Sequence, residues 1–201
     1  MTKRILETAE RVEIDSADAL HAWLDRHGGQ QEGVWVVTWK KGADPEAHVS
    51  AAEVGATALA HGWIDSLPRK LDETRSMLYI APRKPGSNWS RVNKERIARL
   101  RAEGRMRPEG EAAVARAEAD GSWTALDEVE DLVVPDDLAR ALDTEARKTW
   151  DAYPRSVRRG ALEQLVTAKT DATRAKRIAI IVEATAAGER PFQWRGPKTG
   201  G

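Results

Sequence analysis

The fold is decided first by a run of β-branched and aromatic residues, Gly33-Val34-Trp35-Val36-Val37-Thr38-Trp39. This composition predicts a strand, and alternate side chains of the run share one face of a sheet. Working outward along the chain, residues 63–72 and 76–82 predict two further strands joined by a turn at 72–75. We therefore expect a small antiparallel sheet in the N-terminal half.

Helix signals surround these strands. Ser16 is a predicted N-cap of a helix that ends at Gly28. Ser50 and Glu53 form a capping box, in which the hydroxyl and the carboxylate satisfy each other's backbone donors, and Gly62 is a favoured stop for that helix. A basic helix is expected from Ser90 and a second helix from Pro108.

The second half of the chain has no strand signal. The acidic stretch Asp127–Asp131 predicts a linker, and after Pro135 the pattern is almost wholly helical up to Gly188. The expected fold class is α+β, with a mixed N-terminal half followed by an all-helical C-terminal module. The expected domains are an α+β ligand-binding domain over 1–126, a helical module over 127–190 and a mobile tail over 191–201.

Composition excludes several classes of function. The 201 residues include no cysteine, which removes disulfides, thiolate catalysis and cysteine metal sites. No apolar run approaches the roughly 20 residues that span a bilayer, and the N-terminal residues lack the pattern of a signal peptide. We expect a cytoplasmic protein without membrane insertion.

The formal net charge of zero conceals strong patterning. Residues 69–107 carry 12 basic against 4 acidic side chains, and residues 108–146 carry 2 against 12. A dedicated nucleic-acid binder is usually basic as a whole, so nucleic acid is an unlikely partner. Attraction between the two blocks is the simpler interpretation.

A cluster of aromatic, basic and amide residues is the strongest candidate for a binding site. Arginine offers a planar fork to a carboxylate or phosphate, and tryptophan offers a face for stacking or cation–π contact. We expect these side chains to line a cleft for an anionic or planar small molecule. The candidate ligand-binding residues are Trp39, Lys40, Trp63, Arg69, Arg83, Lys84, Trp89, Asn93 and Arg96.

The helix after Trp89 carries a specific ambiguity. Asn93 and Arg96 lie on the same stripe as Trp89, and a buried polar side chain must find partners or lose several kcal/mol. Either Asp65 or Asp72 pairs with Arg96, or this helix lines a pocket that contains water.

Catalysis has only weak candidates. His61 and Asp65 are the one pair that resembles an oriented general base. No serine stands in a nucleophile elbow, so we favour a protein that is not an enzyme. The other histidines are too scattered for a metal site, and we expect neither a metal nor a cofactor.

The chain resembles the YdeI/OmpD-associated family, also called bacteriocin-protection proteins. The resemblance lies in motifs that follow one another along the chain: Gly33-Val34-Trp35 with Lys40-Lys41, Ala60-His61-Gly62-Trp63-Ile64-Asp65, Pro82-Arg83-Lys84-Pro85, Trp89-Ser90, Asn93-Lys94-Glu95-Arg96, Glu103-Gly104-Arg105-Met106, Asp120-Gly121-Ser122-Trp123, Pro135-Asp136-Asp137-Leu138, Ala168-Lys169 and Thr173-Arg174-Ala175-Lys176-Arg177-Ile178. It implies a cytoplasmic bacterial protein linked to stress and to tolerance of bacteriocins or antimicrobial peptides. It implies no agreed reaction.

Together these observations predict a stress-tolerance protein that binds an anionic or planar small molecule in a cleft lined by tryptophan and arginine. A hydrolase-type enzyme that detoxifies such a compound through His61 and Asp65 is the first alternative. A protein-interaction module, whose basic C-terminal helices dock an acidic protein partner, is the second.

Overall fold

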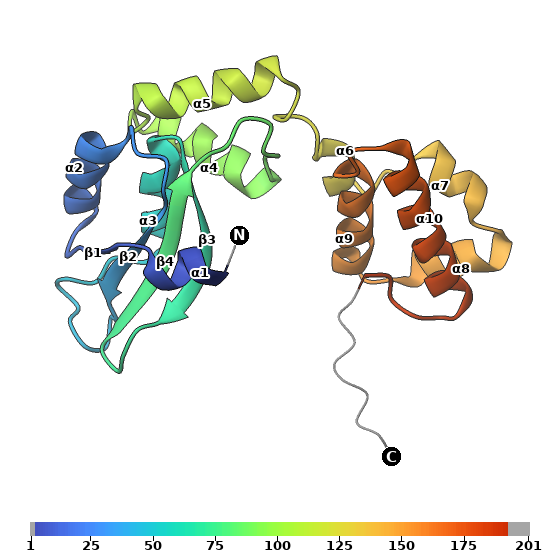
Figure 1. Cartoon of the computed structure of the whole chain (residues 1–201), viewed down its shortest axis with the longest axis horizontal. Helices are drawn as coiled ribbons and strands as arrows, with labels where there is room; N and C mark the ends of the chain where they lie inside the picture. The colour runs from blue at the N-terminus through green and yellow to red at the C-terminus, as the bar shows by residue number, and fades with distance from the viewer. Residues whose placement is uncertain (1–2, 193–201) are drawn as a thin grey trace. The chain divides into compact units, whose positions relative to one another are not determined.

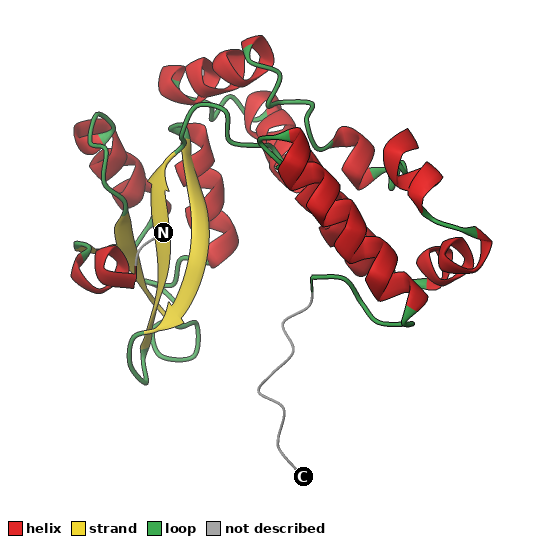
Figure 2. Ribbon diagram, turned by 45° about the vertical axis from the view of Figure 1, so that its right-hand side comes forward, coloured by secondary structure: helices red, strands yellow, loops and turns green. Residues whose placement is uncertain are grey.

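The computed structural model describes residues 3–192 and divides the chain into two compact units, Met1–Trp123 and Thr124–Gly201. The strands lie in the N-terminal unit, whereas the described part of the C-terminal unit is helical (Figure 2), which confirms the α+β fold class. Residues 193–201 of the expected tail lie outside the described residues. The division into a ligand-binding domain and a helical module remains a prediction.

A four-stranded sheet organises the N-terminal unit, with strand order β1-β2-β4-β3. β2 (Val34–Trp39), β4 (Arg75–Pro82) and β3 (Trp63–Lys70) pair antiparallel, as the sequence predicts. β1 (Arg11–Glu13) pairs parallel with β2, so the sheet is mixed rather than antiparallel. Three residues are too short for an alternating pattern, and sequence analysis therefore missed β1.

Helices cover both faces of this sheet. α2 (Ala17–His27) and α3 (Ala51–Ala60) pack their apolar sides on the face that carries Val36 and Ile80. The short helix α1 (Lys3–Thr8) crosses the strands on the opposite face (Figure 1), where the Trp35 indole nitrogen donates to the Leu6 carbonyl oxygen at 2.8 Å. Because both faces are covered, every side chain of β2 from Val34 to Thr38 is buried.

Two more helices complete the N-terminal unit. α4 (Arg91–Ala102) begins after Ser90, whose hydroxyl accepts from the Asn93 amide, as expected for an N-cap. α5 (Pro108–Ala119) follows and runs very close to the end of α3: a Cβ on Gly110 would lie 2.2 Å from the Ala60 carbonyl oxygen. Only glycine allows this approach of the two backbones.

The C-terminal unit is built from α6 (Asp127–Glu130), α7 (Asp136–Ala141), α8 (Thr144–Ala152), α9 (Arg155–Val166) and α10 (Asp171–Ala186). They enclose one apolar core around Trp150. The expected linker at 127–131 is wrong, because most of it forms α6: Glu130 is only 8% exposed and accepts from Arg159 at 2.9 Å. No helix in the described part of the chain is long and apolar enough to span a membrane.

Candidate functional site

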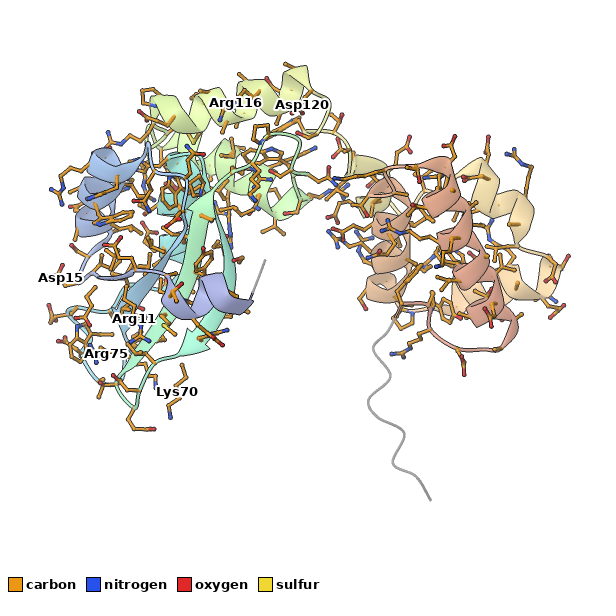
Figure 3. The ribbon with its side chains drawn as sticks, in the orientation of Figure 1. Arg11, Asp15, Lys70, Arg75, Arg116 and Asp120 are labelled. Carbon is orange, nitrogen blue, oxygen red and sulfur yellow. The ribbon has the colours of Figure 1, made fainter. Side chains whose placement is uncertain are left out.

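A narrow pocket lies between α5 and the loop that follows β4. β4 ends at Pro82, and the Arg83 amide donates to the Gly62 carbonyl oxygen at 3.0 Å, which directs the chain into the loop before α4. That loop and the C-terminal half of α5 enclose the pocket, whose rim includes Arg116 and Asp120, both visible on α5 in Figure 3. The pocket is therefore formed by segments about 30 residues apart in the chain.

Arg83 is the central side chain of this pocket. It is only 7% exposed, and its guanidinium carbon lies 3.6 Å from the centre of the Trp89 ring, a cation–π contact. One terminal nitrogen donates to the Asn88 carbonyl oxygen, while Nε and Nη1 have no partner among the described residues. Burial lowers the pKa of Arg83 to about 10, against a smaller opposing effect of Asp65.

Asp120 and Ser122 shape the opposite side of the pocket. The Asp120 carboxylate accepts from the amides of Gly86 and Ser122 at 3.0 and 2.9 Å, which ties the loop before α4 to the end of α5. The buried Ser122 side chain lies beside this carboxylate, and hydrogen bonding from Ser122 lowers the pKa of Asp120. About 10 Å³ remains free, close to the space of one water-sized group. Arg83, with two nitrogen atoms that have no partner among the described residues, therefore lines a space that admits one oxygen atom.

Two of the candidate tryptophans are core residues and belong to different clusters. Trp63 and Trp89 are each 1% exposed. Trp63 packs edge-on against Trp23 in the core between sheet and helices, with ring centres 6.0 Å apart. Trp89 packs against Trp123 under α5. The structure does not bring Trp63 and Trp89 to a common cavity.

Arg96 has a carboxylate partner. Its Nη1 lies 3.7 Å from Asp65 Oδ1 and 3.4 Å from Asn93 Oδ1. Gly55 of α3 lies against this pair, since a Cβ there would lie 3.2 Å from the Asp65 carboxyl carbon. Of the two carboxylates considered from the sequence, Asp65 is the partner, since Asp72 pairs with Arg75.

Trp39, Lys40 and Arg69 lie at the other end of the sheet, away from Arg83 and Lys84. The Lys40 ammonium donates to the carbonyl oxygens of Asp72 and Glu73 at 2.8 and 2.9 Å and so holds the β3–β4 turn. Arg69 lies over the Trp35 ring. The nine candidate residues therefore divide among the pocket, the core, the pair that Arg96 forms with Asp65, and this end of the sheet.

His61 is buried beside a second histidine rather than beside Asp65. Its Nε2 lies 2.9 Å from His21 Nδ1, and its Nδ1 lies 3.6 Å from Asp25 Oδ1. Burial lowers the pKa of His61 to about 4, assisted by His21. Sequence analysis missed His21 because 40 residues separate the two, and only the packing of α2 on α3 joins them. Within residues 3–192 we find no group of three His, Cys, Asp or Glu placed to hold a metal.

The arginines of the C-terminal motif are structural. Arg174 donates to both carboxylate oxygens of Asp137, at 2.6 and 3.0 Å, and to the Leu165 carbonyl oxygen. Arg177 donates to Thr167 and to the Gln164 carbonyl oxygen. Both arginines thus satisfy carbonyl groups at the end of α9, which the helix itself leaves without partners.

Comparison with known proteins divides the chain at nearly the same place. Residues 12–113 match the model of a domain of unknown function, DUF8412. Residues 131–188 match the model described as bacteriocin-protection, YdeI or OmpD-associated. No curated protein and no solved structure gives a significant match. The Arg83 pocket includes residues of the first match, and the structural arginines of α10 lie in the second.

Proposed function

The chain belongs to the DUF8412 family, its residues 131–188 form a bacteriocin-protection, YdeI/OmpD-associated domain, and we propose that the protein supports tolerance of bacteriocins or related stress by binding an anionic small molecule. The tolerance role follows from the description of the C-terminal domain. The binding role is assigned to the N-terminal unit, at the pocket that Arg83 lines.

One observation carries the binding role: the Arg83 guanidinium is buried with two nitrogen atoms that have no partner among the described residues. Arginine stays charged in proteins, and a buried charge is costly unless it is paired. The carboxylate that most favours its charge, Asp65, is already engaged by Arg96. An oxyanion in the pocket supplies the missing acceptor and counter-charge.

The size and surroundings of the pocket select the ligand class. The free space in the pocket that Arg83 lines admits one oxygen of a carboxylate or phosphate. The rest of the molecule then lies at the rim, where Lys84 and Arg116 are exposed. Three cations against one carboxylate, Asp120, leave the opening net positive, which favours an anion over a neutral or cationic ligand.

Titration calorimetry of the whole protein with inorganic phosphate and with acetate tests this proposal. Arg83→Met keeps the approximate length of the side chain and removes the donors, so we expect affinity to fall by about tenfold or more, the effect of a lost charge-assisted hydrogen bond. Arg11→Met, at an exposed position of β1, is the matched control and is expected to bind like the parent protein. Equal affinity of the Arg83→Met protein, or no binding of either anion by the parent, contradicts the proposal.

The stability of the same variant separates binding from a structural role. Replacing an unpaired buried charge with an apolar side chain of similar volume is often neutral or stabilising. Without ligand, Arg83→Met is therefore expected to unfold at the same or a higher urea concentration than the parent. It should nevertheless fail to protect a bacterial host exposed to bacteriocin. A large loss of stability would instead assign Arg83 a purely structural role.

A further inference from the structure

A second cavity, of about 390 Å³, opens at the end of the sheet where α3 begins. It is bordered by β2, by the β3–β4 hairpin and by the segment from His48 to Val54. Figure 3 shows Lys70, one of its lining residues, at the end of the hairpin that lies opposite Arg116 and Asp120. The cavity is therefore separate from the Arg83 pocket, and the inference drawn from it does not depend on the proposed function.

The strand register explains why space remains here. β3 is an edge strand, and between Asp65 and Pro68 it has one residue more than the facing part of β4, a β-bulge. Beyond the bulge the β3 side chains are exposed, and α3, which starts at Ala51, does not extend over this end of the sheet. An apolar part of the sheet face is thus left without a helix above it.

The floor and the rim of the cavity differ in chemistry. The floor is apolar and buried, formed by Val49, Val54 and Leu78, which belong to one core cluster. The rim is basic, with Lys40 and Lys70, whereas the Arg69 guanidinium lies over the Trp35 ring on the opposite face of the sheet. Lys70 pairs with Glu73, but no aspartate or glutamate is among the described residues that line the cavity. Its volume falls within the roughly 300–1,000 Å³ typical of small-molecule pockets.

His48 adds a polar group to the rim. Its Nδ1 lies 2.7 Å from the Trp39 carbonyl oxygen, which can only accept, so Nδ1 carries the proton. Thr38 and Ser76 add two hydroxyl groups, 3.5 Å apart, between the rim and the floor.

We propose that this cavity binds an anionic amphiphile, a molecule with an apolar chain or ring and one acidic group. The apolar part covers the floor and is removed from water, which is the main favourable contribution. The acidic group lies at the rim beside Lys40. The Lys40 ammonium donates to two backbone carbonyls, and it has no carboxylate partner among the described residues. A cationic ligand would find no carboxylate among the described lining residues.

Titration calorimetry of the full-length protein with octanoate, below its micelle concentration, tests the proposal. Octanol has the same apolar chain without the charge, and acetate has the charge without the chain. Octanoate is expected to bind about tenfold or more tightly than either, because only octanoate uses both floor and rim. Octanol binding as tightly as octanoate, or octanoate binding no better than acetate, overturns the proposal.

Paired variants locate the site. Ala51→Trp, at an exposed lining position, fills the opening, whereas Ala52→Trp changes the next exposed residue of α3, which does not line this cavity. Only Ala51→Trp should abolish octanoate binding. Lys70→Glu should weaken octanoate binding about tenfold. Lys148→Glu is the matched control, because Lys148 is similarly exposed and is also paired with a glutamate three residues away, and it should not change octanoate binding. Unchanged binding in both Ala51→Trp and Lys70→Glu places octanoate elsewhere and refutes the site. Arg83→Met removes carboxylate binding at the Arg83 pocket and is expected to leave the tighter octanoate binding at this cavity intact.

Discussion

At the scale of single residues, burial keeps two neighbouring histidines, His21 and His61, uncharged. His61 is 4% exposed, and its Nε2 is engaged by His21. Burial also lowers the pKa of His21, assisted by Arg107 and Arg105, whereas Asp25 opposes the shift. Both histidines are therefore neutral in the folded protein near neutral pH, and they join α2 to α3 through one hydrogen bond.

The lowered pKa of His61 predicts a loss of stability in acid. Above about pH 6.5 the residue is neutral in the folded and unfolded chains, and its contribution does not change with pH. Between about pH 6.5 and about pH 4 only the unfolded chain takes up the proton, so the free energy of unfolding falls as the pH falls. At roughly 1.4 kcal/mol per pKa unit, the expected loss is about 3 kcal/mol by pH 4.

Urea unfolding at a series of pH values measures this loss. His61→Gln keeps a hydrogen-bonding side chain but does not titrate, so its stability should decline less steeply over the same interval. The lowered pKa of His61 would be disproved by equal slopes for the two proteins.

The ion pair of Arg96 with Asp65 is expected to contribute little. Both side chains are 27% exposed and the closest atoms are 3.7 Å apart, and such partly solvated pairs typically contribute below about 1 kcal/mol. A double-mutant cycle with Arg96→Ala and Asp65→Ala should give a coupling energy of that size, and phosphate affinity should not change. A coupling of several kcal/mol would show that the pair is effectively desolvated.

At the scale of elements, one close helix contact organises the N-terminal unit. α5 approaches the end of α3 at Gly110, and Gly62 adopts the left-handed conformation that ends α3, with φ of 77°. The Arg107 amide donates to the Ala60 carbonyl oxygen at 3.1 Å, beside Gly110. The contact therefore fixes α5, whose far end forms one side of the Arg83 pocket.

A pair of glycine substitutions tests this contact. Gly110→Ala places a methyl group against the Ala60 backbone and should destabilise the protein by about 1–3 kcal/mol, as overpacking does. Gly160→Ala, within α9, meets nothing within 4 Å and should stabilise it by about 0.5–1 kcal/mol. Chemical denaturation of both variants measures the two changes in stability. Changes of the same sign and size in both variants would contradict the prediction.

At the scale of the whole molecule, the apolar clusters separate by unit. The three clusters of the N-terminal unit contain no residue beyond Trp123, and the cluster around Trp150 begins at Leu126. A unit with its own core can fold alone.

We therefore expect fragments 1–123 and 124–201 to fold separately. Circular dichroism should show a cooperative thermal transition for each fragment, and the first should retain phosphate binding. If either fragment remains unfolded while the intact chain folds, the division into independent units is wrong.

Local chemistry determined most of the secondary structure of this protein. The strands β2, β3 and β4, the caps at Ser16, Ser50 and Ser90 and the stop at Gly62 follow from signals within a few residues. α6 was not predicted because its acidic residues suggest a solvated linker, whereas Glu130 pairs with Arg155 and Arg159, which lie 25 and 29 residues away.

Only the tertiary structure decided what each polar side chain does. Arg83 and Arg96 lie 13 residues apart in the same basic stretch, yet Arg96 meets Asp65 while two nitrogen atoms of Arg83 have no partner among the described residues. His61 pairs with His21 rather than with Asp65, because the packing of α2 on α3 brings the two histidines together. Sequence determines the type and spacing of such groups along the chain, but their partners depend on which distant segments the packing of sheet and helices brings within about 4 Å.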